Sequence, residues 1–296
     1  MERILMILLM AISCALHAQE QSEPKGKTMD AILLVTFGTS DLGARKAFAN
    51  IERLAKGKFP GYEIRWAYTS EMIRKKLAKK GELFDSPEEA MKKLKEAGVR
   101  KIFVQSLHII PGAEFHEIVK AVSKFQNDFE EVTLSPPLLN SMDDVRKSVR
   151  IMLSKVPADR RKEDAILFMG HGSEKHPSDM IYVATAYAIE KSDDNAFLAT
   201  VEGNPTFDEV LARLKERKIK KAYLLPFMSV AGDHAKNDMA GDEPDSWKSI
   251  LSKNGIASVP VMKGMAEYDE IVNIWLEHLE QTITKNSKSE YRNPKQ

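Results

Sequence analysis

The chain contains the stretch DAILLVTFGTS at residues 30–40 and a closely similar one, DAILFMGHGS, at residues 164–173. Each is an apolar run without polar alternation that ends at a glycine. Such a run is typical of a strand buried on both faces of a parallel sheet. Because the pattern recurs after 134 residues, it indicates a fold with two related halves.

A second match supports duplication. Residues 88–101 align with residues 208–221 at an offset of 120, and both segments have the apolar spacing of a helix. Each leads into a short apolar run, and further strand-like segments bring each half to four strands; these runs lie at residues 63–69, 102–107, 132–134, 196–201, 222–227 and 256–261. Parallel strands need crossover connections, usually helices. We therefore expect an α/β fold of two similar lobes, each a four-stranded parallel sheet flanked by helices, with a cleft between them.

The predicted lobes comprise residues 29–160 and 161–286, and they meet in the highly charged segment 157–163. A last helix is expected at residues 268–284, where it could pack back across the first lobe. Residues 287–296 form a polar tail that we expect to be mobile. Chance likeness among α/β units is the alternative to duplication, but the shared offsets favour duplication.

The balance of charged residues limits the classes of molecule that the protein is expected to bind. The chain has 44 basic and 43 acidic residues, which gives a formal net charge of +1. This balance supplies no long-range attraction to nucleic acid or to an anionic membrane. We therefore expect a small molecule or another protein as the partner, and no nucleic acid.

The N-terminus predicts export. Residues 1–18 contain an apolar run followed by small residues, which is typical of a signal peptide, and residues 19–28 form a polar tether. The run is too short to span a bilayer, so we expect a periplasmic protein without a membrane span. Lipid attachment at Cys14 is the alternative. Cleavage after Ala18 would leave no cysteine, which excludes disulfides and thiolate ligands.

Three residues that can bind a metal follow successive predicted strands of the second half: His171, Glu202 and His234. Ligands of open α/β sheets bind beyond the carboxyl ends of the strands, so these side chains could converge. Imidazole and carboxylate suit Co²⁺, Fe²⁺, Ni²⁺ or Zn²⁺, and three ligands leave positions open for exchange. The alternative is structural: a histidine at a helix start, a capping glutamate and a loop histidine.

The first half lacks this set. Under the two offsets, His171 aligns with Phe37 and His234 with Glu114, and Glu202 falls near Ser70. If the lobes face each other, Glu114 should present a carboxylate opposite His234. His108 and His116 flank this region and are interpreted as structural or surface residues.

The loop Gly38, Thr39 and Ser40 is predicted to bind substrate carboxylates at the start of a helix. Alternatively, Thr39 or Ser40 caps that helix. The acidic stretch 238–245 lacks the spacing of an EF-hand and is interpreted as a solvated loop that closes over the cleft.

Five segments are distinctive: FGTS at 37–40, QSLHII at 105–110, MGHG at 169–172, VEG at 201–203 and VAGDHAKNDMA at 230–240. With them, the chain resembles the anaerobic-type sirohydrochlorin cobaltochelatases over about residues 31–279. The resemblance implies a ferrochelatase-like fold with a tetrapyrrole cleft and no nucleotide. It also implies metal ligands at His171, Glu202 and His234, with His171 as the base that removes a pyrrole proton.

The implied reaction inserts Co²⁺, with Fe²⁺ or Ni²⁺ as alternative metals, into sirohydrochlorin or a related tetrapyrrole. Glu114 and Ser70 are added as catalytic and substrate-binding candidates, and a homo-oligomer is compatible with the sequence. Cobalamin and sirohaem precursors are made in the cytoplasm, which conflicts with export. Two alternatives therefore stay open: a non-catalytic carrier that uses the same cleft, and a periplasmic solute-binding protein, which would not account for the His-Glu-His set.

Overall fold

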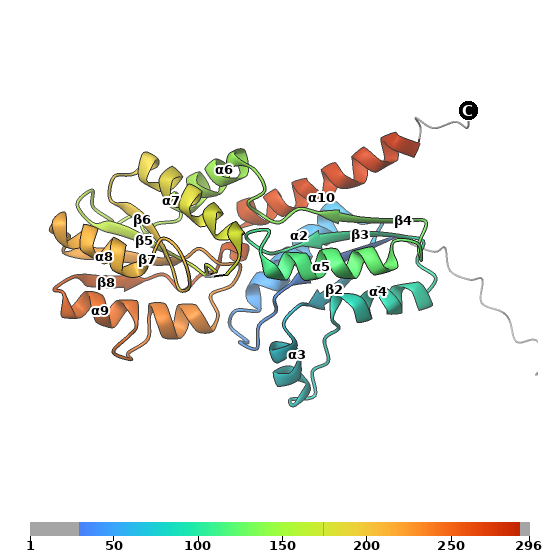
Figure 1. Ribbon diagram of the computed structural model, residues 1–296, viewed down its shortest axis with the longest axis horizontal. Helices are drawn as coiled ribbons and strands as arrows, with labels where there is room; N and C mark the ends of the chain where they lie inside the picture. Colours follow the sequence, from blue (N-terminus) through green and yellow to red (C-terminus); the bar gives the residue numbers. More distant parts are fainter. Residues whose placement is uncertain (1–29, 174, 291–296) are drawn as a thin grey trace, which may run out of the picture.

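Two four-stranded parallel sheets form the cores of two lobes (Figure 1). The structure is a computed structural model that describes residues 30–173 and 175–290. The first sheet has the order β2-β1-β3-β4 and the second the order β6-β5-β7-β8. The strands are β1 (Ala31–Thr36), β2 (Glu63–Tyr68), β3 (Lys101–Ser106), β4 (Glu131–Ser135), β5 (Ala165–Gly170), β6 (Ala196–Thr200), β7 (Lys221–Pro226) and β8 (Ala257–Pro260). The predicted fold class is confirmed.

The two quoted stretches form the inner strands β1 and β5. Each pairs with a neighbour on both sides, and every residue of each strand is buried. A strand covered on both faces has no solvent side on which polar residues would be stable. This explains the unalternated apolar runs in both halves.

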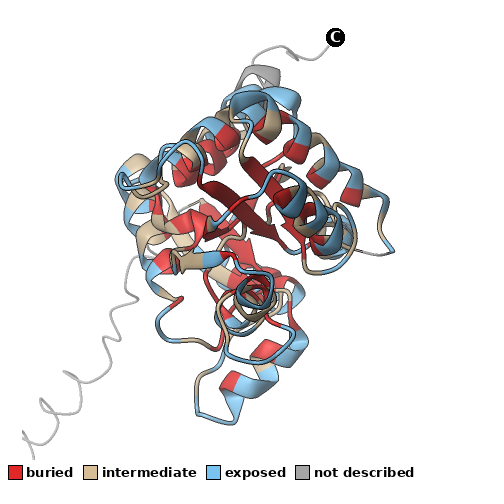
Figure 2. Cartoon of the chain, turned by 90° about the vertical axis from the view of Figure 1, so that its left-hand side faces the viewer, coloured by how far each residue is buried: buried red, intermediate tan, exposed pale blue. Residues whose placement is uncertain are grey.

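Helices cover the sheets, and their outer faces are exposed while the inner strands β1 and β5 are buried (Figure 2). The helices are α2 (Lys46–Lys58), α3 (Glu71–Ala78), α4 (Pro87–Glu96), α5 (Ala113–Phe125), α6 (Met142–Leu153), α7 (Met180–Ser192), α8 (Phe207–Glu216), α9 (Trp247–Lys253) and α10 (Asp269–Glu290). Capping boxes begin α4, at Ser86 and Glu89, and α8, at Thr206 and Glu209. These boxes lie 120 residues apart, so the duplication extends to how equivalent helices begin.

Helix α10 joins the lobes. It packs against α2, β3 and β4 of the first lobe and also against α6, and in Figure 1 it begins near the junction of the lobes and runs along the first lobe. Trp275 of α10 is fully buried, and its indole N–H donates to the carbonyl oxygen of His108 at 3.2 Å. Helix α6 in turn packs against α7. The boundary near residue 160 therefore separates the sheets but not the helical layers.

Two predicted boundaries need comment. The last helix was expected to end at residue 284, but α10 continues to Glu290; the polar tail from residue 287 stays a prediction. The signal peptide, the tether and residues 291–296 lie outside the described residues.

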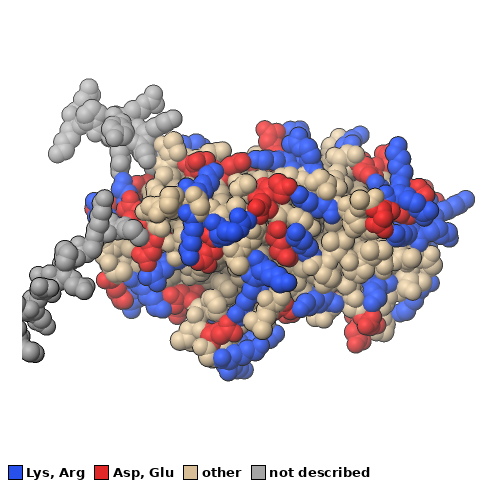
Figure 3. Space-filling model, turned by 180° about the vertical axis from the view of Figure 1, so that it is seen from behind, with Lys and Arg blue, Asp and Glu red and all other residues tan. Residues whose placement is uncertain are grey.

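The surface carries mixed charge. Figure 3 shows basic and acidic side chains interspersed over one face, in keeping with the near-zero net charge. Within residues 30–173 and 175–290, no helix is long and apolar enough to cross a membrane.

Candidate metal site between the lobes

His171 directly follows the last residue of β5 and is exposed. Its Nδ1 lies 3.0 Å from the carbonyl oxygen of Gly172. A carbonyl oxygen can only accept, so in the neutral ring Nδ1 is the nitrogen that carries the proton and Nε2 the one with the lone pair. This is the tautomer in which Nε2 can bind a metal.

His234 comes from the loop after β7, immediately before a π-helical turn at Ala235–Met239. Its Nδ1 lies 2.6 Å from Oδ2 of Asp238, and a carboxylate in that position fixes the ring and leaves Nε2 as the ligand atom. The ring centroids of His171 and His234 are 4.8 Å apart, with the planes at 89°. The predicted convergence of the two histidines is therefore confirmed.

Glu202 lies beside this pair through its backbone. Its N–H donates to the carbonyl oxygen of His171 at 2.8 Å. Gly172 has a φ of +79°, and a Cβ there would lie 1.6 Å from the carbonyl oxygen of Glu202, so only glycine allows the two loops to approach this closely.

The side chain of Glu202 is exposed. Among the described residues, no three His, Cys, Asp or Glu side chains are close enough to hold a metal ion. The structure thus brings the two imidazoles together, while the carboxylate does not complete the set in this conformation.

The loop at Gly38 differs from its prediction. Helix α2 begins only at Lys46, with Arg45 at the cap position and no side-chain cap. The expectation that Thr39 and Ser40 lie at a helix start, and the alternative that one of them caps it, were therefore wrong. Their binding of substrate carboxylates stays a prediction. Instead, the hydroxyl of Thr39 accepts a hydrogen bond from the N–H of Asp41 at 3.1 Å, and both Thr39 and Ser40 are buried.

Gly38 and Ser70 have structural roles in the first lobe. Gly38 has a φ of +97°, and a Cβ there would lie 2.5 Å from the ring of Tyr68. Ser70 caps α3, where its hydroxyl accepts a hydrogen bond from the N–H of Ile73 at 3.3 Å. Neither contact tests the proposed binding of substrate by these residues.

The lobes contact each other next to His234. A Cβ on Gly232 would lie 3.7 Å from the hydroxyl of Thr39, and Lys236 forms an ion pair with Asp41. The hydrogen bond from Lys236 lowers the pKa of the Asp41 carboxyl. The first-lobe loop at residues 38–41 therefore lies against the segment that carries His234.

Helix α5 also faces the second lobe. A Cβ on Gly112 would lie 3.5 Å from the hydroxyl of Ser178, and the rings of His116 and His176 have centroids 5.0 Å apart. Glu114 lies between these positions in the first turn of α5 and is half-buried. Its position opposite His234 stays a prediction.

His108 is structural, as expected. Its Nδ1 lies 3.0 Å from the hydroxyl of Ser106, and its Nε2 is buried without a hydrogen-bond partner among the described residues. Burial lowers the pKa of His108 to about 4. The ring is therefore neutral at physiological pH.

The sequence analysis did not predict two residues that support the candidate site. Asp238 was assigned to a solvated acidic loop, yet it holds His234, and the spacing of four residues was the available signal. Asp179 is buried between the loops that carry His171 and Glu202. No local spacing indicates its position, because its partners are backbone N–H groups from two distant segments.

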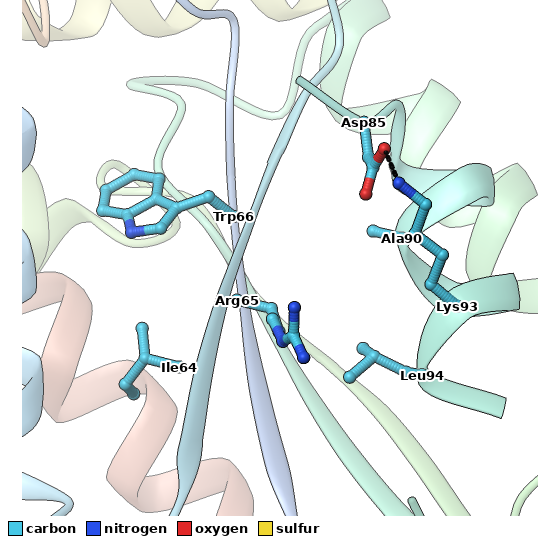
Figure 4. A pocket seen from close by; sticks show the side chains of 7 residues that line it. All are labelled: Ile64, Arg65, Trp66, Asp85, Ala90, Lys93 and Leu94. Atoms are coloured by element: carbon cyan, nitrogen blue, oxygen red, sulfur yellow. Dashed lines mark hydrogen bonds and ion pairs between the residues drawn. The ribbon is translucent and has the colours of Figure 1, made fainter. Parts of the chain in front are cut away.

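Two hollows in the described part of the chain lie elsewhere. One lies between β2 and α4, where Lys93 pairs with Asp85 at 2.6 Å beside Arg65 and Leu94 (Figure 4). The other lies near Pro157 and Asp193. Neither contains a candidate residue, so the histidine pair at the lobe interface is the better candidate site.

Comparison with known proteins shows the family of the chain. A family model described as cobalt chelatase (CbiK) matches residues 30–284. A sirohydrochlorin cobaltochelatase, CbiKC, from Nitratidesulfovibrio vulgaris is 37% identical over 259 residues, which cover 87% of this chain and 92% of that protein. Another from Salmonella typhimurium is 34% identical over 255 residues, covering 86% and 96%.

Solved structures show the same fold. SirB from Bacillus subtilis, determined with Fe³⁺, superposes with a TM-score of 0.58 at 14% identity, covering 88% of this chain and 98% of that one. At this identity the likeness concerns the fold alone, whereas the family model and the two relatives match nearly the whole described chain. The chain therefore belongs to the cobalt chelatase (CbiK) family.

Proposed function

We propose that this protein is a metal-chelating lyase that inserts Co²⁺ into sirohydrochlorin or a related tetrapyrrole without a nucleotide. The observation that carries the proposal is the pair formed by His171 and His234, whose rings meet at 4.8 Å with both Nδ1 atoms already hydrogen-bonded. Two Nε2 lone pairs at an interface between lobes can hold a divalent metal and leave coordination positions open for the macrocycle.

Insertion exchanges one dication for two pyrrole protons. Imidazole can accept a proton near neutral pH, so His171 is the proposed base. One nitrogen cannot hold a metal and a proton together, so His171 takes the proton as the metal leaves it for the macrocycle. The second proton goes to another acceptor, for which Glu114 is our candidate.

Glu202 is the proposed third ligand. Its side chain is exposed, and its N–H donates to the carbonyl oxygen of His171, so the proposal is that the carboxylate turns toward the histidines when the metal binds. A carboxylate would offset the charge of the incoming dication. Gly38, Thr39, Ser40 and Ser70 stay candidates for contacts with the macrocycle, and Fe²⁺ and Ni²⁺ stay alternative metals because the same ligands suit them.

An assay of metal insertion distinguishes a chelatase from a non-catalytic carrier. The relatives described above are named as chelatases, which gives a carrier no support. Mature protein mixed with Co²⁺ and sirohydrochlorin should change the absorption spectrum well above the spontaneous rate. A spectrum that shows binding of the macrocycle but no faster metallation would contradict the proposal. Parallel reactions with Fe²⁺ and Ni²⁺ show which metal the protein inserts fastest.

We also propose that the chain is exported through residues 1–18 and starts near Gln19, on the pattern of its N-terminus. Mass spectrometry of the processed chain tests this. A lipid adduct on Cys14 would show that the lipoprotein alternative is correct.

A further inference from the structure

We propose that Asp179 is a positioning residue that holds the loops of His171 and Glu202 in one arrangement. The inference rests on the proposed metal site. Asp179 lies just before α7 and is 9% exposed. It has no place in the proposed ligand set, so its burial needs another explanation.

The carboxylate of Asp179 links two loops. Its Oδ1 accepts a hydrogen bond from the N–H of Ser173 at 3.0 Å, and its Oδ2 accepts one from the N–H of Asn204 at 2.8 Å. Ser173 comes two residues after His171, and Asn204 two residues after Glu202. A single side chain therefore connects the segments that follow two candidate ligands.

Other contacts leave little space between Asp179 and the two loops. A Cβ on Gly203 would lie 2.7 Å and 2.8 Å from the two oxygens of Asp179, and Gly203 has a φ of +101°. The N–H of Glu202 itself donates to the carbonyl oxygen of His171. The backbones of both candidate ligands are thus joined at the ligand positions and again, through Asp179, two residues after them.

Helix α7 supplies a second support from the same turn. The ring of Tyr182 would meet a Cβ on Gly170 at 2.7 Å, so this side chain packs directly against the residue that precedes His171. Asp179 and Tyr182 lie three residues apart and face the same loop. The start of α7 therefore acts as the platform for His171, while Asp179 alone extends to the loop of Glu202.

The link between the two loops requires two acceptor oxygens on the side chain of residue 179. A carboxylate offers an oxygen to each N–H group, whereas an asparagine offers one oxygen and turns an NH₂ group toward the other N–H. Asp179→Asn keeps the volume of the side chain and should release one of the two loops. The effect should appear in metal affinity, because hydrogen-bonded partners of ligands orient the ligand atoms.

The test compares Asp179→Asn with a matched control in the mature chain. Asp164 is 2% exposed, lies just before the opposite end of β5 and accepts a hydrogen bond from the N–H of Arg161 at 3.1 Å. With Co²⁺ alone as the probe, Asp179→Asn should weaken binding by about 10- to 100-fold, whereas Asp164→Asn should bind like the parent. In the insertion reaction, Asp179→Asn should raise KM for Co²⁺ and leave KM for sirohydrochlorin unchanged.

The outcomes separate this inference from the proposed function. Parental Co²⁺ binding by Asp179→Asn, with binding lost in His171→Ala, would overturn the positioning role only. Parental binding by both variants would place the metal elsewhere. If Asp179→Asn does not fold, hydrogen exchange in the unaltered protein decides: the amides of Ser173 and Asn204 should exchange far more slowly than in a free peptide, and free-peptide rates would overturn the inference.

Discussion

At the scale of single residues, the hydrogen bonds on Nδ1 decide what His171 and His234 can do. A carbonyl oxygen holds one ring and the carboxylate of Asp238 the other, and in the neutral rings these bonds place the lone pair on Nε2. The sequence predicts the positions of both histidines, because residues at the ends of neighbouring parallel strands are close in space. It does not predict the partners of these rings, which depend on the local path of each loop.

His108 gives a prediction on pH. Its pKa is lowered from 6.5 to about 4 by burial, so the unfolded chain binds a proton in a range where the folded chain does not. The free energy of unfolding should therefore fall as the pH drops from about 6.5 to about 4, by at most about 3 kcal/mol. Urea unfolding of the parent and of His108→Gln over this range isolates the contribution. Equal pH dependence in both proteins would show that His108 is not the cause.

At the scale of elements, the sequence predicts a strand or helix best where the whole segment has the same surroundings. The strands β1 and β5 are buried on both faces and are readable as apolar runs. The start of α2 was misplaced, because the eight residues from Gly38 to Arg45 form a loop that packs against Tyr68 and the second lobe. The end of α10 was also misplaced, since a polar, charged segment at the C-terminus resembles a tail.

Helix α10 gives a prediction on stability. Trp275 is fully buried where α10 packs on the first lobe, so Trp275→Ala should lower the free energy of unfolding by about 3–5 kcal/mol. Trp275→Phe keeps most of the apolar contact and should cost less. Gln281→Ala, at an exposed position of the same helix, serves as the control. Urea unfolding measures all three, and a Trp275→Ala variant as stable as the control would show that α10 does not anchor the lobes.

At the scale of the whole molecule, duplication supplies two similar lobes, and only the second has the proposed metal ligands His171, Glu202 and His234. Phe37 stands where the second lobe has His171. The repeat predicts that the lobes are related, and the sequence therefore accounts for both sheets. It does not predict that α6 packs on α7 or that Lys236 pairs with Asp41, because contacts between lobes depend on how two complete surfaces fit.

The most direct test measures Co²⁺ insertion into sirohydrochlorin by the parent, His171→Ala and His234→Ala, with melting temperatures for each. His116→Ala, an exposed histidine of α5, is the control. Neither candidate is buried, so truncation should change the free energy of unfolding by only about 0.5 kcal/mol. The account predicts that both variants lose insertion with nearly unchanged melting temperatures, while the control keeps its activity. Folded variants of His171 and His234 that insert Co²⁺ at the parental rate would contradict it.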